Sequence, residues 1–417
     1  MALSPLTRRI AASFVGLVLS LPIGLVPSDP ALAESVRVLL AQDISQLEVR
    51  SDGDMVVGSQ LGEARAAHFP LHVQLRADGI HVNGRRVSAT ALTIRPVRGG
   101  LYVMMGKNSA AADKNTAVGG TPSPPAGLPV SGALKVFRKG KSLSIVNQVD
   151  LEEYVKGVVP SEVSSSWHPE MLKVQAIAAR TYALYNKMLS ATREYDVVAT
   201  IQDQVYRGRF GVDSRVEEAV ERTRGIVVTH QHSPIYAAFS STAAGPTEDA
   251  VNVWANKDLP YLKGVECPFD LDSPYYQWKA SVKIDQLERN LRQQGFAVGT
   301  IATITPIAYS RAGRVARLRI LHSDGEVILR GEDLRKAVGY TIIPSTQFEV
   351  ESVGAEVTFA GYGAGHAVGL CQWGAKELAE LGYSYASILA YYYPGTELQN
   401  AAVVQLASPS VPLPHVP

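Results

Sequence analysis

The 417-residue sequence predicts an α+β protein, in which a mixed domain of helices and strands follows a small β-rich domain. Short β-branched runs separated by turn dipeptides fill residues 34–105, as in accessory β domains. Residues 106–132 lack apolar periodicity and concentrate Gly, Pro, Ser and Thr, which predicts a flexible linker or a long loop. Helical and strand patterns then alternate over residues 133–400.

Composition and charge exclude several classes of protein. The chain is 46% hydrophobic and 19% charged, which is typical of globular proteins rather than disordered ones. Lys and Arg number 40, Asp and Glu number 39, and the net charge is +1. This balance disfavours a strong electrostatic attraction to nucleic acid or acidic membranes. We therefore expect no nucleic acid partner.

Residues 1–33 have the features of a signal peptide. Arg8 and Arg9 precede an apolar run over residues 10–26, and Ala31-Leu32-Ala33 matches the small-x-small cleavage pattern. The alternative is an uncleaved membrane anchor, but the run is short for a span of about 20 residues. We expect export to the periplasm or cell wall, with membrane contact only through this segment.

The first strands and helix of the mature chain follow from turn and capping signals. Asp78-Gly79 and Asn83-Gly84 are hairpin dipeptides within the β-rich region, and residues 133–149 form a further predicted hairpin. Asp150, with Glu153 three positions later, starts a short helix that we expect Gly157 to end. Residues 158–168 are predicted to be irregular because a proline and a serine run interrupt them.

The next predicted helix spans residues 169–189 and begins at Pro169. Its broad apolar face and small alanines indicate a central buried helix. Further elements are expected as helices at 216–223, 285–294, 331–338, 375–381 and 384–393, and as strands at 225–230, at 235–242 and twice within 308–329. Residues 401–417 are proline-rich and predict a disordered tail.

The chain has only two cysteines, Cys267 and Cys371. In an oxidising compartment they could form a disulfide, and the alternative is two separate buried thiols. The sequence does not decide between the disulfide and the two separate thiols. Two cysteines cannot build a four-cysteine zinc site and no Cys-x-x-Cys occurs, so we expect neither a metal nor a cofactor.

Glu162 is the carboxylate that stands out, because Val158, Val159, Pro160 and Val163 surround it in the sequence. Apolar surroundings remove water from a carboxylate and raise its pKa. Such an acid can donate a proton to a leaving oxygen near neutral pH. The alternative is an ordinary surface or helix-capping glutamate.

Three other side chains are candidates for a site. His366 lies among glycines and precedes Gln372, which is also a candidate for substrate binding. A histidine in this position could bind substrate or share a proton. The alternative for His366 is a tight turn in which its side chain bonds local carbonyls. Arg180 falls on the alanine-rich helix, where a buried arginine needs a partner. It could bind a ligand carboxylate or pair with an internal acid such as Glu162.

Two long blocks resemble the SpoIID/LytB family of stage II sporulation protein D and amidase enhancers. One block runs from residue 147 to residue 182 and contains the V-V-P-S-E motif. The other runs from residue 361 to residue 398 and contains GYGAGHAVGLCQWG. The segment FSSTAAGPTE between them, with Ser240 and Ser241, is also similar to the family. The resemblance predicts a SpoIID-like domain over residues 133–400.

The resemblance implies work on the bacterial cell wall. Active members are lytic transglycosylases that cut peptidoglycan glycan strands, preferably strands denuded of stem peptides, and leave 1,6-anhydro ends. It implies Glu162 as the catalytic acid and base. Arg180, Ser240, Ser241, His366 and Gln372 are our further candidates for residues that line the substrate cleft. Relatives that bind zinc use cysteines where this chain has Val198 and Asp203, so zinc is not expected.

Two alternatives remain. Other relatives are non-catalytic enhancers of an N-acetylmuramoyl-L-alanine amidase, which would then be the partner. A third reading is a structural envelope protein that only binds glycan.

Overall fold

The computed structural model describes most of the chain after the predicted signal peptide, in the ranges 35–59, 62–66, 70–105, 127–254 and 257–404. The prediction of an α+β protein is confirmed, since the described residues form eight α-helices and several β-sheets. Residues 1–33, most of the predicted linker and residues 405–417 lie outside this part. No helix in the described ranges is both long enough and apolar enough to cross a membrane.

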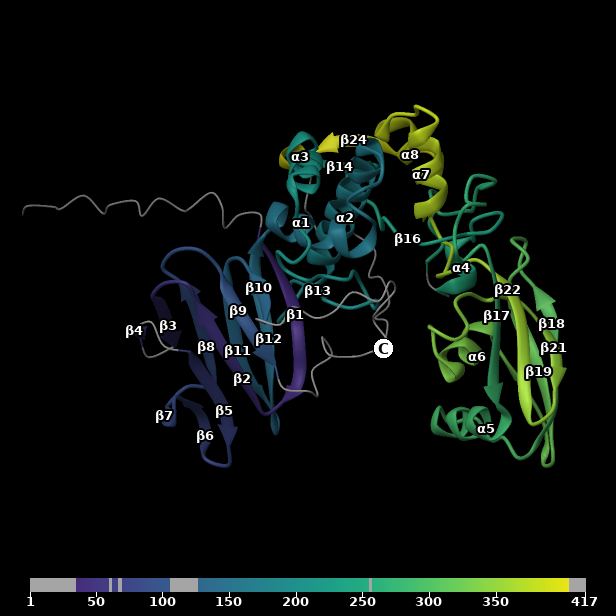
Figure 1. Ribbon diagram of the computed structural model, residues 1–417, viewed down its shortest axis with the longest axis horizontal. Helices are drawn as coiled ribbons and strands as arrows, with labels where there is room; N and C mark the ends of the chain where they lie inside the picture. Colours follow the sequence, from purple (N-terminus) through teal and green to yellow (C-terminus); the bar gives the residue numbers. More distant parts are fainter. Residues whose placement is uncertain (1–34, 60–61, 67–69, 106–126, 255–256, 405–417) are drawn as a thin grey trace, which may run out of the picture.

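Two β-sheets form the lower left of the molecule as drawn in Figure 1. The first has seven strands in the order β13 (Val197–Val198), β1 (Ser35–Ile44), β12 (Ser142–Asp150), β11 (Ala133–Lys139), β8 (Ala91–Pro96), β3 (Met55–Ser59) and β4 (Gly62–Ala66). The second has six strands in the order β10 (Leu128–Val130), β9 (Leu101–Met105), β2 (Gln46–Ser51), β5 (Leu71–Arg76), β6 (Gly79–Val82) and β7 (Arg85–Val87).

The structure divides this region differently from the sequence prediction. The predicted boundary at residue 133 falls inside the seven-stranded sheet, because β12 pairs antiparallel with β1 and β11 pairs antiparallel with β8. Val36 lies opposite Val149, and both are fully buried. Strand pairing satisfies backbone groups that a separate domain would leave at an open edge. β10 lies inside the predicted linker of residues 106–132, so the described end of that segment is a strand of the second sheet.

Helix α1 (Leu151–Glu162) starts where the sequence predicted. The Asp150 side chain accepts hydrogen bonds from the backbone N–H groups of Glu152 and Glu153, at 2.9 and 3.1 Å. This cap satisfies two donors that the first turn leaves free.

The prediction that α1 ends at Gly157 is wrong, because the helix continues to Glu162 with Pro160 in its last turn. A side-chain carbon on Gly157 would lie 2.4 Å from the Gly208 carbonyl oxygen and 2.6 Å from the Tyr206 ring. The glycine therefore permits close packing rather than stopping the helix. Buried Val158 and Val159 in the following turn favour continuation, and Glu162 ends a helix instead of lying in a loop.

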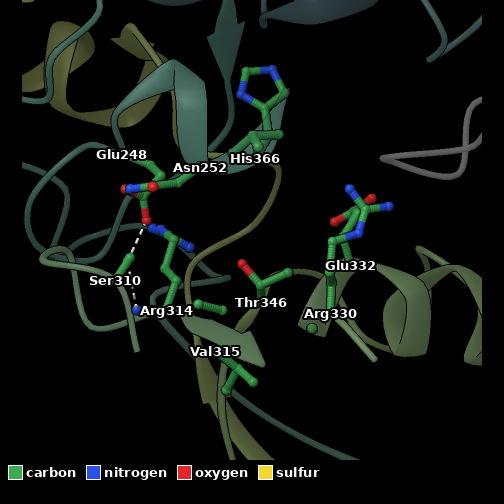
Figure 2. Close-up of a pocket in the computed structure, with 12 residues that line it drawn as sticks. Glu248, Asn252, Ser310, Arg314, Val315, Arg330, Glu332, Thr346 and His366 are labelled. Carbon is green, nitrogen blue, oxygen red and sulfur yellow. Dashed lines mark hydrogen bonds between the residues drawn. The ribbon is translucent and has the colours of Figure 1, made fainter. Parts of the chain in front are cut away.

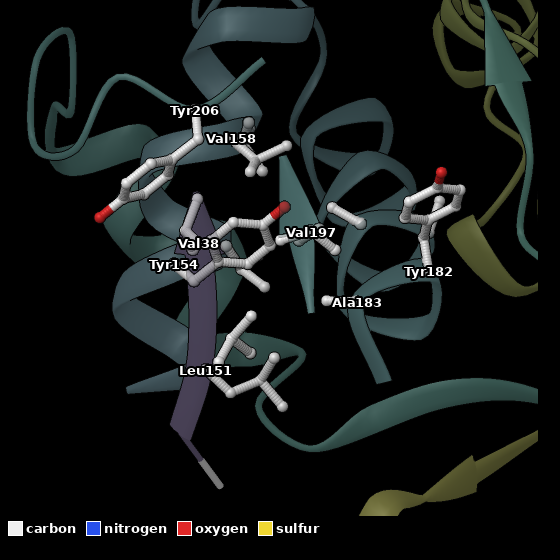
Figure 3. Packing of buried hydrophobic residues seen from close by; sticks show 14 of the residues in the cluster. Val38, Leu151, Tyr154, Val158, Tyr182, Ala183, Val197 and Tyr206 are labelled. Carbon is white, nitrogen blue, oxygen red and sulfur yellow. The ribbon is translucent and has the colours of Figure 1, made fainter. Parts of the chain in front are cut away.

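Helix α2 (Pro169–Leu189) has the predicted bounds and is the central helix of the molecule. It packs against α1, α3 (Ser214–Arg222), α7 (Gln372–Glu380) and α8 (Tyr385–Tyr392). Figure 3 shows Tyr154 of α1 among apolar side chains from β1 and β13. Its ring stacks on Tyr206, with centroids 5.2 Å apart. One apolar core therefore joins the sheets and the helices.

A module with its own core is inserted between β16 (Phe239–Ser240) and β23 (Leu370–Cys371), at the right of Figure 1. The sequence prediction did not separate it from the rest of residues 133–400. Its elements are β17 (Gln277–Lys283), α5 (Ile284–Gln293), β18 (Ile301–Tyr309), β19 (Val315–His322), β20 (Gly325–Leu329), α6 (Gly331–Val338), β21 (Gln347–Val353) and β22 (Glu356–Tyr362). The chain then returns to the main core, where β23 pairs in parallel with β16.

The remaining elements are short. They are β14 (Ile226–His230), β15 (Ser233–Pro234), α4 (Ala250–Val253), β24 (Glu397–Asn400) and a 3-10 helix at Ala401–Val403. The predicted disordered tail thus begins with ordered residues, and the rest of it lies outside the described ranges.

Candidate active site

Glu162 is half-buried at the carboxyl end of α1. Its Oε1 atom accepts a hydrogen bond from the backbone N–H of Val205 at 2.8 Å. The Gln372 side chain hydrogen-bonds to the same carboxyl group. The structure therefore holds this carboxyl between α1, the segment before Tyr206 and the start of α7.

Loss of hydration is the main influence on the Glu162 carboxyl group. It raises the pKa from an ordinary value of 4.5 to about 7, against the opposing hydrogen bonds from Val205 and Gln372. A carboxyl group with this pKa is present in both protonation states near neutral pH. It can therefore give a proton in one step and accept one in the next.

Gln372 is brought to Glu162 by the pairing of β16 with β23. Cys371 lies opposite Ser240 in that pair, and the backbone N–H of Trp373 donates to the Ser241 carbonyl oxygen at 3.1 Å. Gln372 then becomes the first residue of α7, with its side chain buried. Its Nε2 atom donates to the Gln175 Oε1 atom of α2 at 3.3 Å.

Two tryptophans lie beside this carboxyl-amide group in the sequence. Trp167 follows Glu162 by five residues and Trp373 follows Gln372 directly. Their rings make an edge contact with centroids 5.1 Å apart. Both rings are half-buried, so each keeps an exposed surface. Flat aromatic rings suit the apolar faces of sugars. Neither tryptophan was predicted to have a role, although both lie close to a candidate site residue in the sequence.

A second polar cluster lies two helical turns further along α2, about 10 Å from Gln175 along the helix axis. The Tyr182 hydroxyl donates to Asp203 Oδ1 at 2.7 Å, and burial raises the pKa of Asp203. The Lys257 ammonium lies 3.6 Å from the centre of the Tyr236 ring. Burial lowers the pKa of Lys257 to about 8. Sequence reasoning missed this cluster because its members come from α2 and from separate segments that follow it in the chain.

Ser240 and Ser241 lie next to the site as structural supports. The Ser240 hydroxyl accepts a hydrogen bond from the Ala367 backbone N–H at 3.1 Å, and Ser240 is buried. The Ser241 carbonyl oxygen accepts the hydrogen bond from the Trp373 N–H at the start of α7. Their described contacts therefore position the second sequence block rather than offer groups to a ligand.

Arg180 does not line the cleft, which corrects the prediction that it binds substrate. The side chain is fully buried and its Nε and Nη2 atoms donate to the two carboxylate oxygens of Glu152, at 2.9 and 2.6 Å. The acid that pairs with it is thus Glu152 and not Glu162. A buried guanidinium needs such a partner, and Glu152 on α1 faces it across the helix pair.

His366 lines a pocket together with Glu248, Asn252, Arg314 and Arg330 (Figure 2), and Glu162 does not line that pocket. Its Nδ1 atom accepts a hydrogen bond from the Val368 N–H at 3.0 Å. Burial, with the positive charges of Arg335 and Arg314, lowers the pKa of His366 to about 3. The imidazole is therefore neutral at physiological pH and does not share a proton with Glu162.

The geometry defines an α+β protein in which a buried amide contacts the Glu162 carboxyl group, whose pKa is raised, and two tryptophans in contact with each other lie close to these residues in the sequence. Comparisons with known proteins agree with this class. Residues 139–230 match the Stage II sporulation protein (SpoIID) domain family, and residues 266–369 match a domain of unknown function, DUF8618.

Three relatives illustrate the similarity. An uncharacterised protein of Brachyspira hyodysenteriae is 32% identical over 65% of this chain and 73% of its own length. The stage II sporulation protein D of Bacillus amyloliquefaciens is 33% identical over 61% of this chain and 76% of its own length. The amidase enhancer of Bacillus subtilis is 32% identical over 59% of this chain and 40% of its own length. The chain belongs to the SpoIID/LytB family, and its role is related to the cell wall.

Proposed function

We propose that this protein is an exported peptidoglycan lytic transglycosylase of the periplasm or cell wall. The observation that carries the proposal is the half-buried Glu162 carboxyl group, whose pKa of about 7 suits an acid that becomes a base. Ordinary glycosidases use two carboxyl groups because they activate water. A lytic transglycosylase needs only one, because the 6-hydroxyl of the sugar takes the place of water.

The reaction balances with a single proton shuttle. The protonated Glu162 carboxyl group donates its proton to the glycosidic oxygen, the bond from that oxygen to C1 breaks, and the leaving sugar departs as an alcohol. The Glu162 carboxylate then accepts the proton of the 6-hydroxyl while O6 bonds to C1. The product carries a 1,6-anhydro end, and Glu162 is protonated again.

The surroundings of Glu162 support a sugar polymer as substrate. Trp167 and Trp373 offer ring faces beside the acid, and the hydrogen-bonding cluster around Tyr182 and Asp203 lies along the same side of α2. A spacing of about 10 Å along the helix suits groups on successive sugars.

Mass spectrometry of the products from purified glycan strands tests the proposal. We expect wild type to release anhydro-ended fragments and Glu162→Gln to release none, because an amide keeps the shape but cannot donate the proton. Glu153→Gln is a matched control, since Glu153 lies on the same helix and is held by Lys156 and Arg209. Equal product release by Glu162→Gln would remove this residue from the mechanism.

The similarity to the amidase enhancer of Bacillus subtilis favours a second candidate function. In that case the protein binds the wall and stimulates an N-acetylmuramoyl-L-alanine amidase. The expected result is then no release of glycan fragments by the purified protein alone, together with faster release of stem peptides by an added amidase. Glu162→Gln would leave that stimulation unchanged.

A further inference from the structure

Cys267, Asp270 and Cys371 meet in the interior, at the point where the inserted module joins the main core. The thiol and carboxylate atoms of the three residues all lie within 4.8 Å of one another. Each residue is about 1% exposed. Neither cysteine is in a disulfide. Cys371 thus joins Cys267 and Asp270, which are about a hundred residues away in the sequence, to place three possible metal ligands around one point.

We propose that Cys267, Asp270 and Cys371 bind a zinc-like divalent cation that joins the base of the inserted module to the start of α7. Two sulfur ligands and one carboxylate oxygen favour zinc among the common divalent metals. Cys267 and Asp270 also have the spacing of a Cys-x-x-ligand pair, with aspartate in place of the second cysteine. The inference does not depend on the reaction proposed for Glu162.

The hydrogen bonds around the cluster are those of a site built for negatively charged ligands. The Ala244 backbone N–H donates to Asp270 Oδ2 at 2.8 Å, and the Ala243 backbone N–H lies 3.3 Å from Cys371 Sγ. Donors of this kind stabilise and orient metal ligands from behind. Ala244 has a φ angle of 53°, so the backbone adopts a costly left-handed conformation where it supports Asp270.

A second observation points to a missing ligand. Asp270 Oδ1 is buried and has no hydrogen-bond partner among the described residues. A buried carboxylate oxygen without a partner is costly, and a metal ion would satisfy it. A disulfide between the two cysteines would leave this oxygen as it is. A metal ion would bind all three side chains, whereas a disulfide would involve only the two cysteines.

Gly374 lets the backbone of α7 approach both sulfur atoms closely. A side-chain carbon at this position would lie 2.6 Å from Cys267 Sγ and 3.5 Å from Cys371 Sγ. The Tyr392 hydroxyl lies 3.2 Å from Cys267 Sγ, so the sulfur atoms are tightly enclosed. The three side chains supply three of the four ligands of a tetrahedral site. Binding releases the two thiol protons, with no oxidation or reduction.

The charges balance if both thiols are deprotonated. Two thiolates and one carboxylate around a divalent cation leave one negative charge, and buried Arg314 interacts electrostatically with both Asp270 and Cys371. The metal would have a structural consequence for the candidate active site as well. Cys371 caps α7 and directly precedes Gln372, so the site fixes the residue that contacts Glu162.

Metal analysis of the full chain, purified with a thiol reductant and loaded with zinc or cobalt, tests the proposal. We expect about one metal ion per chain, a sulfur-to-cobalt charge-transfer band, and a lower thermal unfolding midpoint after chelation. Cys371→Ser and Asp270→Asn should lose the metal. Asp270→Cys should retain it, which distinguishes loss of a ligand from loss of the fold. Asp272→Asn is the matched control, because Asp272 is exposed in the same segment.

Three results would overturn the proposal. The first is a chain without metal under saturating zinc. The second is metal retained by both Cys371→Ser and Asp270→Asn. The third is protein isolated with both cysteines in one disulfide, detected as the absence of alkylated thiols after unfolding without reductant.

Discussion

The carboxyl group of Glu162, at the end of α1, lies within hydrogen-bonding contact of the amide side chain of Gln372, at the start of α7. This contact joins the two sequence blocks that resemble the SpoIID/LytB family. It depends on a helix that continues past Gly157 and on the parallel pairing of β16 with β23. Predictions about catalysis and stability follow from it.

The pH dependence of activity should follow the protonation of Glu162. Because the first step needs the protonated carboxyl group, kcat/KM for glycan cleavage is expected to be constant below pH of about 7 and to fall about tenfold for each pH unit above it. Gln372→Leu removes a hydrogen bond that stabilises the carboxylate, so the fall should move to higher pH. Gln286→Leu, at an exposed site on α5, is the control. A profile that Gln372→Leu leaves unmoved would contradict this role.

Glu162 should also make folding stability depend on pH. Between pH 4.5 and about 7 the folded state keeps a proton that the unfolded state has released. The free energy of unfolding of wild type should therefore fall as pH rises through this window, by up to about 3 kcal/mol. Denaturant titrations at several pH values measure this change. Glu162→Gln should show a smaller dependence and exceed wild type in stability above pH 7, and equal slopes for the two proteins would argue against the raised pKa.

Arg180 should act on stability and not on glycan affinity. Arg180→Met leaves the buried Glu152 carboxylate without its guanidinium, which is expected to cost about 3–5 kcal/mol of unfolding free energy. Adding Glu152→Gln should recover part of that loss. Arg209→Met, which breaks a surface pair with Glu153, should cost about 1 kcal/mol or less. If correctly folded Arg180→Met bound glycan more weakly than wild type, the prediction that Arg180 contacts substrate would be supported after all.

The paired tryptophans should contribute to substrate binding. Trp373→Ala removes a ring face beside the acid, and stacking of this kind is worth about 1 kcal/mol or more, so a several-fold increase in KM is expected. The kcat value should change less. Steady-state kinetics on soluble glycan strands separate the two effects. Trp278→Phe, in the inserted module, is the comparison variant. An unchanged KM for Trp373→Ala would show that the glycan does not bind against the Trp373 ring.

The sequence predicted those parts of the fold that local signals determine. The cap at Asp150, the start at Pro169 and the bounds of α2 and α6 were read from capping and periodicity. Gly157 and Pro160 misled the prediction, because glycine and proline are helix-breaking signals only where packing does not require them. The insertion of a separate module was not predictable, since its apolar core becomes visible only when strands pair.

The candidate site was predicted only in part for the same reason. Apolar neighbours identified Glu162, and burial in the structure explains its raised pKa. Arg180 was identified as needing a partner, but its pairing with Glu152 depends on how α1 and α2 face each other. The cluster of Cys267, Asp270 and Cys371 was not foreseen, because the meeting of the first two residues with Cys371 depends on the β16–β23 pairing.

The most direct measurement of the central claim is mass spectrometry of glycan strands incubated with wild type and with Glu162→Gln under identical conditions. The account predicts 1,6-anhydro ends from wild type and none from the variant, while both proteins bind the strands. Anhydro ends produced equally by the two proteins would contradict it.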